Sequence, residues 1–189
     1  MKLLKTDLPG VLIVEAPAFA DDRGWFMESF NEQRWTDALA ALGEPLPRRF
    51  VQDNHSCSHA GVLRGIHYQL HPHAQGKLVR VVKGSVFDVA VDLRKGSPTF
   101  GRWFGTELSA VNRRQLWVPE GFGHGFVALE DDTHFLYKTT DVYAKACERA
   151  IRWDDPQLAI DWPLERAGSR VRVSDKDQAA PLLEAAQTY

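Results

Sequence analysis

The sequence lacks a long apolar run. Near the amino terminus, the longest stretch of consecutive apolar residues is Val11 to Val14, and Lys5, Asp7 and Pro9 precede it. A signal peptide needs roughly 7–15 apolar residues and a transmembrane helix about 20, so this segment predicts neither. We therefore expect a cytoplasmic protein that makes no membrane contact.

Cysteine is scarce, and neither sign of charge dominates. The two cysteines, Cys57 and Cys147, form no C-x-x-C motif, so we expect free thiols in a reducing compartment. The chain has 23 Lys and Arg against 25 Asp and Glu, and the basic residues are scattered along it. This balance argues against nucleic acid as the main partner.

Helical periodicity is also scarce. It is confined to Asn31 to Leu42, with Asn31 as N-cap and Gly43 as the stop, and to a tail segment from Asp177 to Ala186. Both segments are predicted to be peripheral. No repeat or linker divides the 189 residues, so residues 1–189 are predicted to form a single domain.

Short apolar runs between turn residues dominate the sequence, a pattern that is typical of strands. The clearest is Val86 to Leu93, whose alternation predicts one packed face and one more polar face. Lys77 to Val82 precedes it across a short link that contains Gly84, so these two runs are predicted to pair as a hairpin. Similar runs follow at Trp103 to Leu108, Gln115 to Val118, Gly125 to Leu129 and Thr133 to Thr139. Their spacing predicts an all-β fold of two packed sheets.

Three polar clusters interrupt the apolar runs, and each has two interpretations. Arg64 and His67 share a cavity only if Gly65 marks a bulge, and otherwise they are surface residues. His124, within the glycine-rich run PEGFGHGF, belongs to a ligand-facing turn or is a satisfied core histidine. Tyr137, with Tyr143 six residues later, is a functional hydroxyl or a packed core ring. These patterns alone do not decide between the alternatives.

The histidines also raise the possibility of a metal centre. Gly61 to His67, followed by the pattern from Pro119 to His124, resembles the two signature turns of the cupin superfamily, a jelly-roll barrel of two antiparallel sheets. The resemblance implies that a metal-binding cupin carries a second His two residues after the first and a Glu further on. Here Gln69 stands where the second His is expected, and no Glu lies between His67 and Gln75. We expect no metal, and we expect His71 and His73, which flank Pro72, to lie in a solvated loop.

Taken together, the motifs resemble one cupin family along nearly the whole chain, the dTDP-4-dehydrorhamnose 3,5-epimerases. The matching segments are DDRGWFMESF, FVQDNHSCSHAGVLRGIHYQ, AQGKLVRVVKGSVFDVAVDLRKGSPTFG, LSAVNRRQLWVPEGFGHGF, FLYKTTDVY, IRWDDPQLAIDWP and SDKD. The departures are the His71-Pro72-His73 loop and Gly123, where such sequences often have Ala. The resemblance implies a cupin jelly roll with short peripheral helices and a homodimer.

The resemblance also implies an activity and its residues. The family inverts C3 and C5 of a dTDP-linked 4-keto-6-deoxy sugar without a cofactor. It implies His67 as proton acceptor oriented by Asp177, Tyr137 as proton donor, and Lys77 beside the keto oxygen. Tyr143 is then expected to stack on the thymine ring. The remaining substrate contacts that it implies are Arg23, Glu28, Gln52, Asn54, Arg64, His124, Glu148 and Lys176.

The chemistry of a 4-keto sugar independently requires such residue types. Removing the proton at C3 or C5 gives an enolate whose charge collects on O4, and a cation such as Lys77, helped by Arg64, lowers that barrier by about 3–4 kcal/mol. Inversion then needs a base and an acid on opposite faces of the ring, which His67 and Tyr137 supply. Arg23 and Arg64 are the candidates for binding the diphosphate.

Three other functions stay open from the sequence. A relative that inverts only C3 or only C5 would carry the same motifs. A metal-dependent cupin oxygenase would depend on iron or manganese. A non-catalytic module would bind the nucleotide sugar without changing it, but the joint presence of His67, Asp177, Lys77 and Tyr137 argues against that function.

Overall fold

The computed structural model describes residues 1–168 and 171–189, and most of its regular structure is β. Within these residues the elements, in chain order, are β1 (Lys2–Lys5), β2 (Leu12–Glu15), β3 (Ala18–Asp21), β4 (Gly24–Met27), α1 (Glu32–Leu42), β5 (Gln52–Ser58), β6 (Leu63–Gln69), β7 (Lys77–Lys83), β8 (Ser85–Asp92), β9 (Trp103–Ser109), β10 (Gln115–Val118), β11 (Phe122–Ala128), β12 (Thr133–Thr139), β13 (Glu148–Ala150), α2 (Asp175–Gln178) and the 3-10 helix η1 (Leu183–Ala185).

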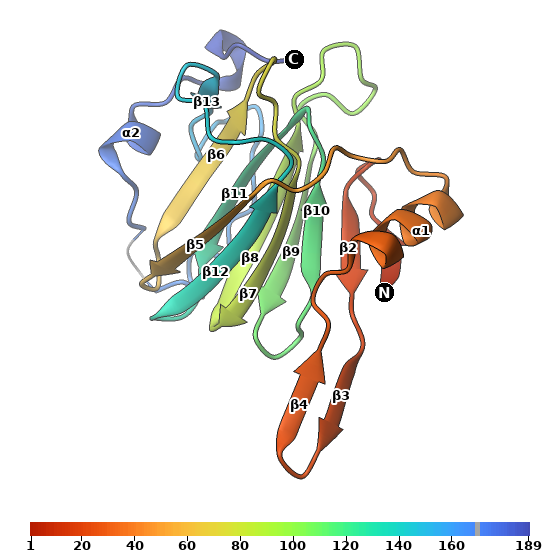
Figure 1. Ribbon diagram of the computed structural model, residues 1–189. Helices are drawn as coiled ribbons and strands as arrows, with labels where there is room; N and C mark the ends of the chain where they lie inside the picture. The colour runs from red at the N-terminus through yellow and green to blue at the C-terminus, as the bar shows by residue number, and fades with distance from the viewer. Residues whose placement is uncertain (169–170) are drawn as a thin grey trace.

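Two antiparallel sheets face each other, as the jelly-roll prediction requires (Figure 1). The six-stranded sheet has the order β1-β2-β10-β7-β12-β5, and the five-stranded sheet has the order β13-β6-β11-β8-β9. The strands β10 and β12 have the bounds predicted from the sequence, whereas β11 begins at Phe122, before the predicted Gly125. The predicted fold class is therefore confirmed.

The predicted hairpin between Lys77 to Val82 and Val86 to Leu93 is wrong. The strand β7 pairs with β10 and β12, whereas β8 pairs with β9 and β11 in the other sheet. Gly84, at a φ of 74°, lets the short link carry the chain from one sheet to the other instead of back along the same sheet. A glycine link marks a change of direction but does not specify the pairing partner.

Three apolar clusters stabilise this arrangement. Between the sheets, Val79 and Phe135 of one sheet pack against Val86 and Phe126 of the other. The outer face of the five-stranded sheet is covered by carboxy-terminal residues that include Trp162. Each large apolar side chain that is fully buried contributes about 1.5–3 kcal/mol, so both faces of this sheet add to stability.

Helix α1 covers the outer face of the six-stranded sheet next to β2 (Figure 1). Its sequence signals are confirmed, because Asn31 caps the amino end by accepting from the Arg34 backbone N–H at 3.1 Å, and Gly43 ends it at a φ of 69°. Trp35 and Leu39 form its buried face. The helix therefore stabilises the sheet from outside without approaching the cavity described below.

The predicted tail helix from Asp177 to Ala186 is replaced by two short helices, α2 and η1. Pro181 lies between them, and a proline has no backbone N–H to continue a helix. Among the described residues, no helix is both long enough and apolar enough to cross a membrane.

The hairpin of β3 and β4 extends away from both sheets (Figure 1). Phe19, Trp25 and Phe26 on this hairpin are 63%, 56% and 70% exposed. Large aromatic side chains that lie together on a surface often mark an interaction site.

Candidate functional site

A cavity of about 360 Å³ lies among strands of the two sheets. Of the residues predicted from the sequence, it brings together three of the four catalytic candidates and six substrate-binding candidates. Its lining residues are Gln52, Asn54, His55, Ser56, Arg64, His67, Tyr68, Gln69, Gln75, Lys77, His124, Phe126, Phe135, Tyr137, Tyr143 and Glu148.

A bulge in β6 turns Arg64 and His67 toward the same cavity. His67 is paired with His124 and Arg64 with Phe126, so three steps along β6 match two steps along β11. Gly65 lies at this irregularity with a φ of 127°, and a Cβ there would come within 2.5 Å of Gly125 Cα. The bulge that the sequence required for a shared cavity is therefore present.

His67 is held from behind by Asp177, as predicted. Its Nε2 contacts Asp177 Oδ1, and Asp177 is held in turn by α2, whose capping Ser174 Oγ accepts from the Asp177 backbone N–H at 3.1 Å. Burial alone would raise the pKa of Asp177, but the hydrogen bond and charge of His67 outweigh it and hold this pKa below its usual value. The arrangement fixes the ring and leaves Nδ1 for the cavity.

Lys77 is the buried cation of the site. Its Nζ donates to the His67 backbone carbonyl at 3.1 Å. Burial lowers the pKa of Lys77 to about 8, and the charges of Asp88 and Glu148 oppose that shift. An ammonium near its pKa and close to His67 can stabilise an anion that forms in the cavity.

A second His–Asp pair lies deeper and was missed in the sequence. His124 Nε2 lies 3.0 Å from both carboxylate oxygens of Asp88, and both residues are buried. Burial raises the pKa of Asp88, while the charges of His124 and Lys77 oppose the shift. His124 thus satisfies both interpretations of its motif, since it is a hydrogen-bonded core histidine that also lines the cavity.

The sequence predicted that β8 has one packed face and one more polar face, but in the structure both faces are packed. Carboxy-terminal residues cover one face, and the face that carries Asp88, Val86 and Ala90 points into the space between the sheets. An aspartate within an otherwise apolar strand was the available signal, because an acidic residue that is buried needs a partner.

Tyr137 enters the cavity from the opposite sheet to His67. It lies on β12, next to Phe135, and is half-buried. Burial raises the pKa of Tyr137, although the positive charge of Arg64 opposes the shift, so its hydroxyl keeps its proton at neutral pH. The structure therefore places a proton donor across the cavity from an imidazole.

Hydrogen-bonded side chains organise the rim of the cavity. The Tyr143 hydroxyl donates to Glu148 Oε2 at 2.8 Å, and Lys176 Nζ reaches the same oxygen at 2.6 Å. Burial would raise the pKa of Glu148, but the hydrogen bonds from Lys176 and Tyr143 hold it below its usual value. Lys176, which is not among the lining residues, therefore acts at the rim through Glu148.

Two amides support the same rim. Gln52 Oε1 accepts from the Tyr143 backbone N–H at 2.9 Å, and Gln52 Nε2 donates to Asn54 Oδ1 at 3.0 Å. Asn54 Nδ2 is buried and has no hydrogen-bond partner among the described residues. An unpaired buried donor in a cavity is available to a ligand.

Arg23 and Glu28 lie outside this cavity. Arg23 is at the tip of the projecting hairpin and pairs with Asp21, and Glu28 follows β4 and pairs with Arg34 at 3.1 Å. The structure therefore does not bring these two predicted substrate contacts to the cavity of their own chain.

Gln69, at the position where a metal-binding cupin would carry its second histidine, has a different role. Its Nε2 donates to the carbonyls of His73 and Val142, and its Oε1 accepts from the Ala144 N–H at 2.7 Å. Gln69 thereby holds the loop that carries Tyr143. The predicted loop at His71 and His73 is also present, with both residues in a turn after β6.

Comparison with known proteins identifies the family. The family model described as dTDP-4-dehydrorhamnose 3,5-epimerase matches residues 5–185. The dTDP-4-dehydrorhamnose 3,5-epimerase of Shigella flexneri is 55% identical over 94% of this chain and 93% of its own length. Among solved structures, the Legionella pneumophila 3,5-epimerase in complex with dTDP-4-keto-L-rhamnose has a TM-score of 0.89 at 50% identity, covering 97% of this chain and 93% of that one. A 3'-monoepimerase from Streptomyces bikiniensis in complex with dTDP-quinovose has a TM-score of 0.84 at 35% identity, covering 97% and 88%.

Proposed function

The chain belongs to the dTDP-4-dehydrorhamnose 3,5-epimerase family, and from that premise we propose that it converts dTDP-4-dehydro-6-deoxy-D-glucose to dTDP-4-dehydro-L-rhamnose. The observation that carries the proposal is the placement of His67 on β6 and Tyr137 on β12, in opposite sheets around one cavity. A base and an acid on opposite sides of a bound sugar ring are what inversion of a carbon requires.

Proton abstraction is assigned to His67. Asp177 contacts Nε2, so Nδ1 is the nitrogen that takes the proton from C3 or C5. The Asp177 carboxylate then stabilises the imidazolium that forms, in the manner of a catalytic His–Asp pair.

Stabilisation of the negative charge that develops on O4 of the enolate is assigned to Lys77. Its buried ammonium, already held beside His67, needs little reorganisation when the charge develops. Tyr137 then delivers its proton to the opposite face, which gives the inverted centre. The cycle is complete when His67 returns its proton, through solvent, to the phenolate of Tyr137.

Binding of the nucleotide part of the substrate is assigned to residues at the rim of the cavity. Arg64 supplies a guanidinium for the diphosphate, and Tyr143, which is 54% exposed, offers an aromatic face to the thymine. Gln52, Asn54, His124, Glu148 and Lys176 complete the contacts on this chain. Binding energy from this remote part of the substrate holds the small sugar ring in position for proton transfer.

A single-site epimerase is the second candidate. It is favoured by the structural likeness to a 3'-monoepimerase, which shares the fold at a TM-score of 0.84. One base and one acid serve either outcome, so the two functions are separated only by the number of carbons that exchange.

The proposal is tested by incubating the protein with dTDP-4-dehydro-6-deoxyglucose in deuterated water and following the sugar by NMR. We expect deuterium at both C3 and C5, whereas deuterium at one carbon would establish the single-site enzyme. The His67→Ala variant is expected to lose about 10²–10⁴-fold in exchange at both carbons. His59→Ala, an exposed histidine outside the cavity, is the control. No deuterium uptake by the unmodified protein would refute the function.

We further infer one domain, a homodimer and a cytoplasmic location. The dimer is supported by the hairpin of β3 and β4, because its exposed aromatic side chains and Arg23 are available to a second copy. The cytoplasm is supported by the nucleotide-sugar substrate and by the two free cysteines.

A further inference from the structure

A second group of ligand-type side chains lies on the six-stranded sheet. Cys57 on β5 is the register partner of His134 on β12, and Asp132 lies in the turn just before β12. One ligand atom from each of these three residues lies within 4.8 Å of the others. Their strand neighbours Ser56 and Phe135 line the cavity, whereas Cys57 and His134 do not. His55, two residues before Cys57 on β5, lines the cavity as well.

Two hydrogen bonds converge on a single oxygen of this group. The Cys57 thiol lies 3.2 Å from Asp132 Oδ1, and His134 Nε2 lies 3.1 Å from the same atom. These two hydrogen bonds bring a sulfur, an imidazole nitrogen and a carboxylate oxygen close together. A divalent cation could take the place of the protons in these bonds with small movements of the side chains.

His55 adds a second layer to the group. Its Nε2 lies 3.0 Å from His134 Nδ1. A histidine that binds a metal through one nitrogen commonly donates its other N–H to a neighbouring acceptor, which orients the ring. His55 is positioned to accept that hydrogen and so leave the His134 Nε2 lone pair free for a cation.

We propose that Cys57, Asp132 and His134 form a binding site for a zinc-type divalent cation, with water at the fourth position. A thiolate, an imidazole and a carboxylate are the ligand classes of zinc, whereas magnesium and calcium prefer oxygen alone. On binding, the Cys57 thiol releases its proton to solvent. The proton of His134 shifts from Nε2 to Nδ1 and that of His55 shifts from Nε2 to its own Nδ1, so the His134 Nδ1–H donates a hydrogen bond to His55 Nε2.

A lysine side chain flanks the site. Lys83 pairs with the other oxygen of Asp132. With thiolate and carboxylate present, the positive charge of Lys83 leaves the site with one net negative charge that attracts the cation.

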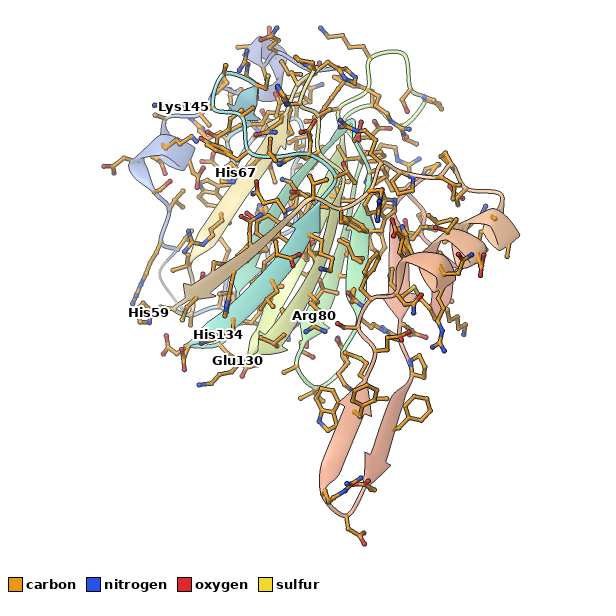
Figure 2. The ribbon with its side chains drawn as sticks, viewed as in Figure 1. His59, His67, Arg80, Glu130, His134 and Lys145 are labelled. Atoms are coloured by element: carbon orange, nitrogen blue, oxygen red, sulfur yellow. The ribbon has the colours of Figure 1, made fainter. Side chains whose placement is uncertain are left out.

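The three proposed ligands lie outside the proposed active site. Figure 2 shows His134 near the beginning of β12, well away from His67. Neither Cys57 nor His134 is among the residues that line the cavity. His55 lines the cavity and also contacts His134, so it adjoins both sites. Because the three proposed ligands are not among the lining residues, cation binding can be measured without substrate.

Cobalt titration of the metal-stripped full chain tests the proposal, because thiolate ligation to Co²⁺ gives a charge-transfer absorption. We expect this absorption to saturate at one Co²⁺ per chain and to disappear when Zn²⁺ is added. Cys57→Ser should abolish it, while Cys147→Ser, the chain's other free cysteine, should keep it. His134→Ala should weaken Zn²⁺ binding by about tenfold or more, and His59→Ala should not.

The controls make each outcome decisive. Circular dichroism and deuterium exchange on substrate should be unchanged in Cys57→Ser, which shows that the variant is folded. The proposal is overturned if the unmodified chain gives no such absorption, if the absorption survives in Cys57→Ser, or if Cys147→Ser abolishes it.

Discussion

At the scale of single residues, Lys77 is the side chain whose burial most clearly disfavours its charged form. An ammonium buried between two sheets loses its hydration, which is why its pKa falls to about 8. The nearby charges of Asp88 and Glu148 keep it from falling further. A cation kept in so dry a place interacts strongly with an enolate, so the same burial that disfavours the charge makes it catalytically effective.

The activity should therefore depend on pH through Lys77. Because the protonated form is the one that stabilises the enolate, kcat/KM is expected to fall as pH rises above about 8, by about tenfold per pH unit. The pKa of Tyr137 is raised above its ordinary value of about 10, so loss of its proton belongs to a higher pH range. Steady-state measurement of kcat/KM from pH 6 to pH 10 tests for this fall, the alkaline limb of the pH profile.

The matched variant for this profile is Lys77→Gln. It is expected to lower kcat by about 10²–10³-fold and to remove the alkaline limb. If the limb near pH 8 persisted in Lys77→Gln, another group would be responsible for it, and the assignment of Lys77 would be wrong.

At the scale of elements, the bulge of β6 depends on one position without a side chain. A Cβ on Gly65 would lie 2.5 Å from Gly125 Cα and 2.8 Å from the His124 carbonyl oxygen. Both atoms belong to the backbone of β11, so neither can move aside without breaking the pairing that sets His67 opposite His124. The approach of two glycine-containing strands is thus what directs Arg64 and His67 to one side.

Gly65→Ala should consequently destabilise the fold and disturb the site together. We expect a loss of about 2–4 kcal/mol, from the left-handed backbone and the steric overlap combined. Urea unfolding measures it. Gly96→Ala is the control, because Gly96 also has a positive φ, at 84°, but nothing lies within 4 Å of its Cβ. Equal losses in the two variants would show that steric contact with β11 is unimportant.

Elements with local signals were predictable from the sequence. Helix α1 agrees with its capping residues, and β10 and β12 agree with the short apolar runs that predicted them, because both signals act within a few residues. The partner of β7 was not predictable, since Gly84 permits the chain to turn toward either sheet. Pairing is decided by packing between residues that are distant in sequence.

The site was predictable to a similar extent. The arrangement of His67 and Asp177 was predicted by resemblance, although 110 residues separate them in the sequence. Asp88 was missed, because alternation shows which residues share a face but not whether that face meets water. The cluster of Cys57 and His134 was also invisible, since it depends on the register of β5 against β12.

At the scale of the whole molecule, the hairpin of β3 and β4 is unexplained by a single chain. It contributes little to either sheet, and it carries exposed aromatic residues and Arg23 away from the cavity (Figure 1). A two-fold dimer would bury the aromatic rings and place each Arg23 against the partner. In the proposed homodimer, Arg23 and Glu28 would serve the cavity of the partner chain, which would explain why the family resemblance predicts them as substrate contacts although they lie outside the cavity of their own chain.

Mixed dimers test whether Arg23 of one chain serves the active site of its partner. Arg23→Ala and His67→Ala are each expected to be nearly inactive, but refolded together in equal amounts they should regain about a quarter of the unmodified activity, because half of the dimers then hold one intact site. Deuterium exchange on substrate measures it. His67→Ala mixed with Tyr137→Phe is the control, since both residues line the cavity of their own chain and no intact site can form. If Arg23 acts within its own chain, the first mixture will stay as inactive as the second.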